Sequence, residues 1–275
     1  MKHIENKREQ IKNIALKNPN LSAREIGKLV NLHRTTVNYH LRKLNIFRDR
    51  ATLQKCNNTQ RSFDIEISNE AEQIILGSIL GDGTITKWKR CTNSKLNLNS
   101  SLTICHTSPQ KDYLLYKKQL LEKYGIKCHK ISIIPKERLQ KYCPTILGKT
   151  YTINDRYSLS TRRAISFNKY RDLFYKDIKY INPYIKKLDN LGLAIWYMDD
   201  GYKHVGTYFL CTNCFDLESV KLLQEVLLEN FNIETTLNKG YKGAYIIHIR
   251  AKSANLFKSK IESFICDSMK YKLYT

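Results

Sequence analysis

The stretch "LGLAIWYMDDGYK", Leu191 to Lys203, is a mostly apolar segment that ends at two adjacent carboxylates and a glycine. An earlier stretch, "IILGSILGDGTI" from Ile74 to Ile85, has the same form. Both segments are apolar nearly all round, so each is expected to form a helix that is buried on most sides. Acids at the ends of such helices are electrostatically unfavourable, because the C-terminal end of a helix carries partial negative charge.

The two acidic ends are expected to lie together and to hold a metal ion. Side by side, helix ends that carry Asp82 and Asp200 repel each other unless a cation lies between them. Carboxylates and free terminal carbonyls are the oxygen ligands that Mg²⁺ prefers, and Mn²⁺ is expected to substitute. Near a phosphodiester, an ion held in this way activates water and stabilises the departing oxygen. The alternative is that each Asp-Gly only starts a turn, but the pattern recurs at the same place in two similar segments.

Glycines around the two acids predict how the helices pack. Gly77 and Gly81 stand four apart and permit close backbone approach, while the second helix offers Ala194 as its small residue. Gly83 and Gly201 are expected to leave the helices at positive φ, which glycine tolerates.

The chain repeats itself weakly from about residue 68 onward. After each acidic helix the pattern indicates strands, a helix, two further strands and a closing helix. Asp82 and Asp200 are separated by about the length of one small α+β domain. The sequence therefore predicts an α+β fold with two pseudo-symmetric halves, 68–187 and 188–275, related by a pseudo-two-fold axis.

A separate helical unit is predicted for residues 1–48. Ser22 and Glu25 form a capping box ahead of "AREIGKLV", and the next segment repeats apolar residues at helical spacing. Two short helices joined by a tight turn are typical of a helix-turn-helix, although many three-helix bundles look similar. Residues 49–67 are polar without periodicity and are expected to be a linker. The residues expected on the exposed face of the recognition helix are Arg34, Thr35, Thr36, Asn38, Tyr39 and Arg42.

The charge balance favours a polyanionic partner. The chain has 47 Lys and Arg against 25 Asp and Glu, a formal net charge of +22. Nucleic acid is the commonest partner for such a charge, the alternative being a solvated basic surface or a ribosome-associated protein. No apolar run is long enough to span a membrane and "MKHIENKREQ" lacks the core of a signal peptide, so an intracellular location is expected, in a bacterial cytoplasm or an organelle. The eight cysteines, with one CxxC pair at Cys211 and Cys214, are expected to be reduced thiols rather than a zinc site.

The paired motifs resemble those of the LAGLIDADG homing endonucleases, in the monomeric form that carries two motifs in one chain. "ILGSILGDG" (75–83) and "LAIWYMDDG" (193–201) fall on the nine-residue motif without gaps. The resemblance implies two αββαββα halves whose antiparallel sheets lie in the DNA major groove, preceded here by the appended helix-turn-helix. It implies that Asp82 and Asp200 are the catalytic, metal-binding acids.

Further site residues follow from the same resemblance. Gly81 and Asp199, one position before the acids, would offer backbone carbonyls to the metal. Lys272 matches a lysine near the end of related chains, and Lys179 is its expected counterpart in the first half. The implied base-reading residues alternate with apolar residues on the predicted strands; they are Lys87, Lys89, Arg162, His248 and Arg250.

The sequence thus predicts a Mg²⁺-dependent, site-specific endonuclease of an intron or intein type of mobile element. Its expected partner is double-stranded DNA with a long asymmetric target site, which the protein binds as a monomer. Two alternatives stay open: a transcription regulator that keeps the fold without cleaving, and an intron RNA maturase.

Overall fold

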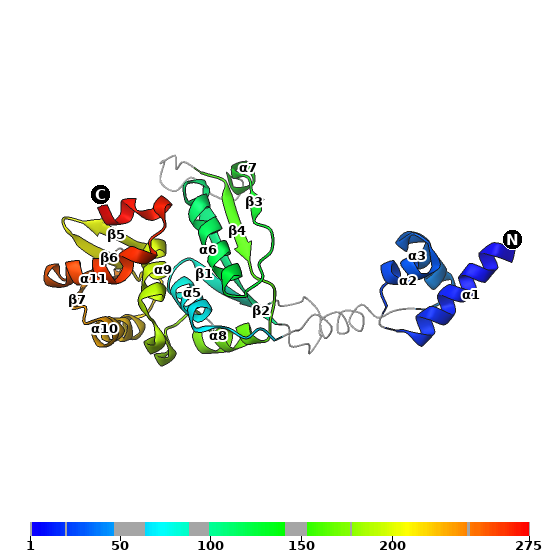
Figure 1. Ribbon diagram of the computed structural model, residues 1–275, viewed down its shortest axis with the longest axis horizontal. Helices are drawn as coiled ribbons and strands as arrows, with labels where there is room; N and C mark the ends of the chain where they lie inside the picture. The colour runs from blue at the N-terminus through cyan, green and yellow to red at the C-terminus, as the bar shows by residue number, and fades with distance from the viewer. Residues whose placement is uncertain are drawn as a thin grey trace. The chain divides into compact units, whose positions relative to one another are not determined.

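The computed structural model describes residues 2–19, 21–46, 64–87, 99–140, 153–176, 178–240 and 243–274. They belong to two compact units (Figure 1). Unit 1 contains the described residues up to 46, and unit 2 contains those from Asp64 onward. None of the helices in these ranges has both the length and the hydropathy that a bilayer-crossing segment needs.

Unit 1 is a three-helix helix-turn-helix made of α1 (Lys2–Lys17), α2 (Ala23–Val30) and α3 (Arg34–Lys43). The predicted capping box is present: the Glu25 amide donates to Ser22 Oγ at 3.2 Å, and the Ser22 amide donates to Glu25 Oε2 at 2.7 Å. The turn is tight because a Cβ on Gly27 would lie 2.4 Å from the Leu32 carbonyl oxygen. A small apolar core closes the unit, formed by Ile11, Ala15, Ile26, Val30, Val37 and Leu41.

Unit 2 has the predicted α+β composition, and its two halves have similar successions of elements. The helices are α5 (Asn69–Leu80), α6 (Lys111–Lys123), α7 (Lys136–Gln140), α8 (Ser166–Phe174), α9 (Asn190–Asp200), α10 (Leu217–Phe231), α11 (Ala254–Ile261) and α12 (Tyr271–Tyr274). The strands are β1 (Gly83–Lys87), β2 (Ser100–Thr107), β3 (Ser132–Ile134), β4 (Arg156–Ser160), β5 (Gly201–His204), β6 (Thr207–Cys211), β7 (Thr235–Lys239) and β8 (Tyr245–Ile249). The two successions differ by α7 between β3 and β4 and by α12 at the end of the second half.

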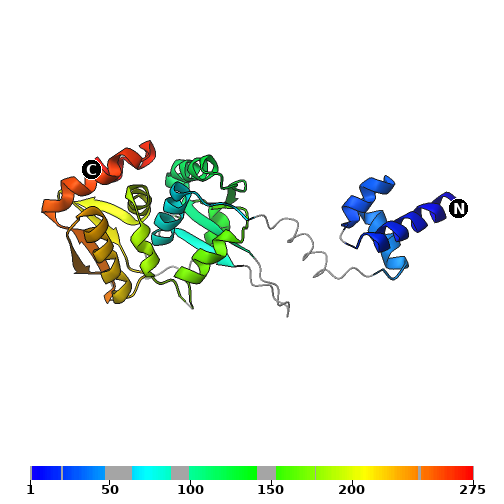
Figure 2. The ribbon, with the colours of Figure 1, turned by 60° about the horizontal axis from the view of Figure 1, so that its bottom comes forward.

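The two sheets are antiparallel and have the same topology. Their strand orders are β1-β2-β4-β3 and β5-β6-β8-β7. Register matches as well, since Gly83 pairs with Ile104 in the first sheet and Gly201 pairs with Leu210 in the second. Helices cover one face of each sheet (Figure 2). That face is apolar and packs into a shared core, while the other face is partly exposed. The shared strand order and register therefore make the two halves related, as predicted.

Helices α5 and α9 lie side by side between the two sheets (Figure 1). A Cβ on Gly77 would lie 2.4 Å from the Gly192 carbonyl oxygen, and one on Gly81 would lie 2.3 Å from the Cβ of Asp199. Both glycines thus permit the predicted close approach of the two helices. The residue on α9 that faces Gly77 differs from the expectation, because it is Gly192 rather than Ala194. Gly192 stands before the nine-residue motif, which is why the motif alone did not indicate it.

The expectation of positive φ at Gly83 and Gly201 was wrong. Gly201 has φ −88° and ψ 156°, and Gly83 is not among the described glycines with positive φ. Space is the reason for glycine at both positions. A Cβ on Gly83 would lie 2.6 Å from the Ser78 carbonyl oxygen, and one on Gly201 would lie 2.1 Å from the Tyr197 ring.

Candidate active site

The two motif acids lie at the adjoining ends of α5 and α9, with Asp200 the last residue of α9 and Asp82 two residues after α5. Burial raises the pKa of the Asp200 carboxyl to about 7, and the negative charges of Asp82 and Asp199 add to this effect. The Asp82 side chain keeps 40% of its surface exposed. Its pKa is also raised, first by burial and then by Asp199. Within the described part of the chain, no ion pair or hydrogen bond satisfies Asp200. The arrangement concentrates negative charge that the nearby lysines offset only in part.

Two lysines cover the carbonyl oxygens at these helix ends in corresponding ways. Lys179 Nζ donates to the oxygens of Gly81 at 3.1 Å and Gly83 at 3.3 Å. Lys272 Nζ donates to the oxygens of Met198 at 2.7 Å and Asp199 at 3.0 Å. Burial lowers the pKa of both lysines, and the neighbouring acids oppose that shift. Each ammonium group offsets the partial negative charge of one helix terminus.

The side chain of Asp199 has a structural environment that sequence reasoning missed. It is fully buried and pairs with Lys117 Nζ at 2.6 and 2.8 Å. Tyr113 Oη donates to the same carboxylate at 2.8 Å, and the Asp82 amide donates to it at 3.1 Å. Asp199 therefore ties the end of α9 to α6 and to the end of α5. The available signal was Lys117 itself, which falls on the buried stripe of α6 with Tyr113, Leu114 and Leu121.

His106 is a second residue that sequence reasoning missed. Its Nδ1 lies 3.1 Å from Gln110 Oε1 and 3.4 Å from Asp82 Oδ2. Burial, followed by the charge of Lys117, lowers the pKa of His106 to about 4, so its ring is neutral at pH 7. Its Nε2 lies 3.9 Å from Asp199 Oδ1, and no group in the described residues hydrogen-bonds to it.

These donors fit a divalent metal ion. Ligand atoms of Asp82, His106 and Asp199 lie within 4.8 Å of one another. Asp199 already balances Lys117, so Asp82 and Asp200 are the carboxylates of the site that form no ion pair with a lysine or arginine within the described residues. Oxygen ligands of this kind suit a hard divalent ion, and a neutral imidazole nitrogen is a further donor.

Comparison with known proteins gives the family. Residues 72–257 match the model of the LAGLIDADG DNA endonuclease family. The chain belongs to this family. The cytochrome b mRNA maturase bI2 of Saccharomyces cerevisiae is 31% identical over 73% of the chain, which spans 46% of that protein. The DNA endonuclease I-ChuI of Chlamydomonas applanata is 24% identical, with 76% of the chain and 96% of that protein covered.

A solved structure agrees with the LAGLIDADG fold. The homing endonuclease I-WcaI bound to its DNA recognition sequence is 24% identical, with a TM-score of 0.61. The match covers 82% of this chain and 94% of that one.

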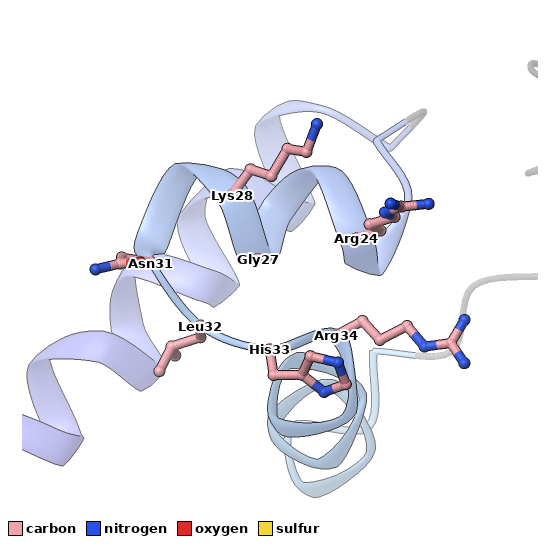
Figure 3. Close-up of a pocket in the computed structure, with 7 residues that line it drawn as sticks. All are labelled: Arg24, Gly27, Lys28, Asn31, Leu32, His33 and Arg34. Carbon is pink, nitrogen blue, oxygen red and sulfur yellow. The ribbon is translucent and has the colours of Figure 1, made fainter.

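Unit 1 matches a winged helix-turn-helix DNA-binding model over residues 5–45. Of the residues expected on the recognition face, Arg34, Thr35, Asn38, Tyr39 and Arg42 are exposed and Thr36 is half-buried. A hollow of about 600 Å³ lies between α2 and the start of α3 (Figure 3). Three of its lining residues carry cationic side chains, namely Arg24, Lys28 and Arg34.

The expected base-reading residues of the LAGLIDADG sheets have different surroundings. Lys89 and the side chain of Lys87 lie outside the described residues. Arg162 is exposed just beyond β4, and Arg250, just beyond β8, pairs with Glu234 at 3.2 Å. His248 lies on β8, where its ring nitrogens contact the hydroxyls of Thr207 and Thr236.

Proposed function

We propose that this protein is a site-specific double-strand DNA endonuclease that requires a divalent metal ion, held by Asp82 and Asp200. One observation carries the proposal. A chain with a net charge of +22 keeps two carboxylates at adjoining helix ends that form no ion pair with a lysine or arginine among the described residues, and burial raises the pKa of both. Metal and nearby phosphate together would relieve that conflict.

Different residues of the site bind the metal and stabilise charge on the phosphate. Asp82 and Asp200 hold the metal, for which Mg²⁺ is the proposed ion and Mn²⁺ a substitute, and the carbonyl oxygens of Gly81 and Asp199 lie beside them. The bound ion would lower the pKa of water and stabilise the departing oxygen. Lys179 and Lys272 hold positive charge beside the scissile phosphates, where charge develops on phosphoryl oxygens.

The proposed partner is one long, asymmetric DNA duplex, bound by a single chain. Two related halves joined in one chain make separate surfaces for the two sides of a target. The lysines and arginines outside the sheet faces supply phosphate affinity that carries no sequence information. Residues 1–48 are proposed to add a further DNA contact through α3, and residues 49–67 to connect it to the core.

RNA is the second candidate substrate, because a maturase is among the relatives. A protein that binds RNA and one that binds DNA both need a basic surface, so the fold does not distinguish the two activities. The two motif acids favour DNA cleavage, because RNA binding alone needs no metal-binding carboxylates.

The test is incubation of the full chain with the flanking DNA of its own gene, joined without the intervening element. With Mg²⁺ we expect one linear product from a supercoiled plasmid, and none with EDTA. Specific binding to this DNA without any cleavage would favour a regulator. Binding or splicing of the intron RNA without cleavage of the DNA would favour a maturase.

A further inference from the structure

The outward faces of the two sheets carry different chemistry at corresponding positions. Because Gly83 and Gly201 follow the two motif acids and pair with Ile104 and Leu210, the strands can be aligned residue by residue. The next pairs on the outward face are Thr84 with Thr103 in the first sheet and Tyr202 with Phe209 in the second. These positions are thus the first outward-facing pair beyond each acid.

The second sheet carries an aromatic row, defined as Tyr202, Phe209 and His248. Tyr202 and Phe209 stack with ring centroids 5.0 Å apart and planes 6° apart. Phe209 and His248, which pair across β6 and β8, stack at 4.5 Å and 14°. Tyr202 is 38% exposed and the other two rings are half-buried, so the row is a surface feature.

His248 contributes its ring to this row rather than a hydrogen-bonding group. Its Nε2 lies 3.0 Å from Thr207 Oγ1, and its Nδ1 lies 3.2 Å from Thr236 Oγ1. With both nitrogens occupied, the ring is fixed flat against Phe209. The row therefore presents carbon atoms and ring edges.

The corresponding row of the first sheet consists of hydroxyl groups. Thr103 pairs with Ser160 as Phe209 pairs with His248, and their hydroxyls lie 3.0 Å apart. The neighbouring Thr86 is exposed, and its hydroxyl lies 3.2 Å from that of the buried Ser101. The hydroxyls of Thr86, Thr103 and Ser160 can donate to or accept from either kind of base edge.

We infer that the two sheets read their half-sites by different chemistry, and that the aromatic row binds thymine methyl groups in the major groove of one half-site. This rests on the proposed function. The methyl group of thymine is the apolar feature of the major groove, and Phe side chains contact it there. The hydroxyl row of the first sheet reads its half-site through hydrogen bonds instead.

DNA is the occupant that fits this aromatic row best. The row begins two residues after Asp200, on the strand that starts at the acidic site, so a duplex placed at the acids passes over it. The chain's net charge of +22 favours a polyanion over a second copy of itself. The aromatic row of this basic protein is therefore expected to contact the apolar group of the duplex, the thymine methyl.

The test begins with a target and needs no cleavage. The full chain carrying both Asp82→Asn and Asp200→Asn is used to select bound sequences from a pool of random duplex DNA. Each thymine of the selected site is then replaced by deoxyuridine, which removes only the methyl group, and Kd is measured. We expect one or more thymines on one side of the site to show a loss of about four-fold each, equal to about 0.8 kcal/mol for one buried methyl-sized group.

Variants then assign that loss to the row. Tyr202→Thr and Phe209→Thr should each reduce the uracil penalty on that side, whereas Thr103→Val, a matched change in the first sheet, should leave it unchanged. Thermal unfolding of each variant checks its fold, and the uracil scan on the chain with the unaltered aromatic row is informative without these variants. A selected site with no methyl-dependent thymine overturns the inference, as does a penalty that survives in folded Phe209→Thr.

The outcomes also separate the two proposals. If methyl dependence is found but wild-type protein with Mg²⁺ does not cut the selected site, the proposed function fails and the reading of the row stands. If the site is cut without methyl dependence, only the reading of the row fails. If no sequence is enriched, both fail.

Discussion

Lys179 and Lys272 lie half-buried at the ends of α5 and α9, where each donates to two carbonyl oxygens. We predict that Lys179→Met or Lys272→Met slows cleavage by about 10²–10³-fold, the range for one lost electrostatic stabiliser. The double variant should be slower still. DNA affinity should change little, because one positive charge among many is lost. Single-turnover rates at saturating enzyme measure the effect, and unchanged rates in both single variants would make these lysines ordinary structural charges.

The buried pair of Lys117 and Asp199 should matter mainly for stability. Lys117→Met leaves a buried carboxylate without its counter-charge, which costs about 3–5 kcal/mol in the free energy of unfolding. Adding Asp199→Asn removes that charge, and the asparagine oxygen can still accept from the Asp82 amide. We therefore expect the double variant to be more stable than Lys117→Met alone. Urea unfolding decides this, and equal stability of the two variants would contradict the role of the pair.

At this scale, sequence identifies residues whose chemistry is local and misses those that need a distant partner. Asp82 and Asp200 stand out because each ends an apolar helix. The side chain of Asp199 has its partners on α6, far away in the chain, so its neighbours in sequence give no sign of them. His106 lies on the buried face of β2 with Leu102 and Ile104, and its closeness to Asp82 follows only from the pairing of β1 with β2.

The contact of α5 with α9 sets how far apart the two acids lie. Gly77→Ala places a Cβ 2.4 Å from the Gly192 carbonyl oxygen, and that atom is backbone that cannot turn aside. We expect a loss of about 1–3 kcal/mol in unfolding free energy, typical of overpacking, together with slower cleavage. Gly240→Ala is the control, because its nearest atoms lie at 3.3 Å or more. Equal melting temperatures for both variants would show that the helices have room to separate.

The elements themselves were largely predictable. The apolar helices, the strands and the capping box at Ser22 agree with the periodicity and local propensity of the sequence. The backbone conformation of Gly83 and Gly201 could not be predicted from the sequence, because a glycine is required either by a positive φ or by a close contact. The sequence does not distinguish these two uses, and here Ser78 and Tyr197 take up the space.

The helix-turn-helix unit should add affinity rather than chemistry. A fragment of residues 64–275 retains the contacts of Asp64 and Ile65 with Ser166 and the whole of unit 2. We expect it to cleave at saturating concentration, with a weaker Kd, a shorter footprint and a smaller salt dependence of binding, since fewer phosphates are contacted. A folded fragment that binds the target core and never cuts it would contradict an accessory role.

The central claim is that Asp82 and Asp200 hold the metal that cleaves the two strands. The most direct measurement is a strand-resolved, single-turnover cleavage assay with Mg²⁺ on target DNA labelled on both strands. It compares the wild-type protein with Asp82→Asn and Asp200→Asn, and Kd is measured in parallel. We predict that each variant binds the target nearly as tightly as wild type and makes no double-strand break. Cleavage of both strands by either variant at close to the wild-type rate would contradict the account.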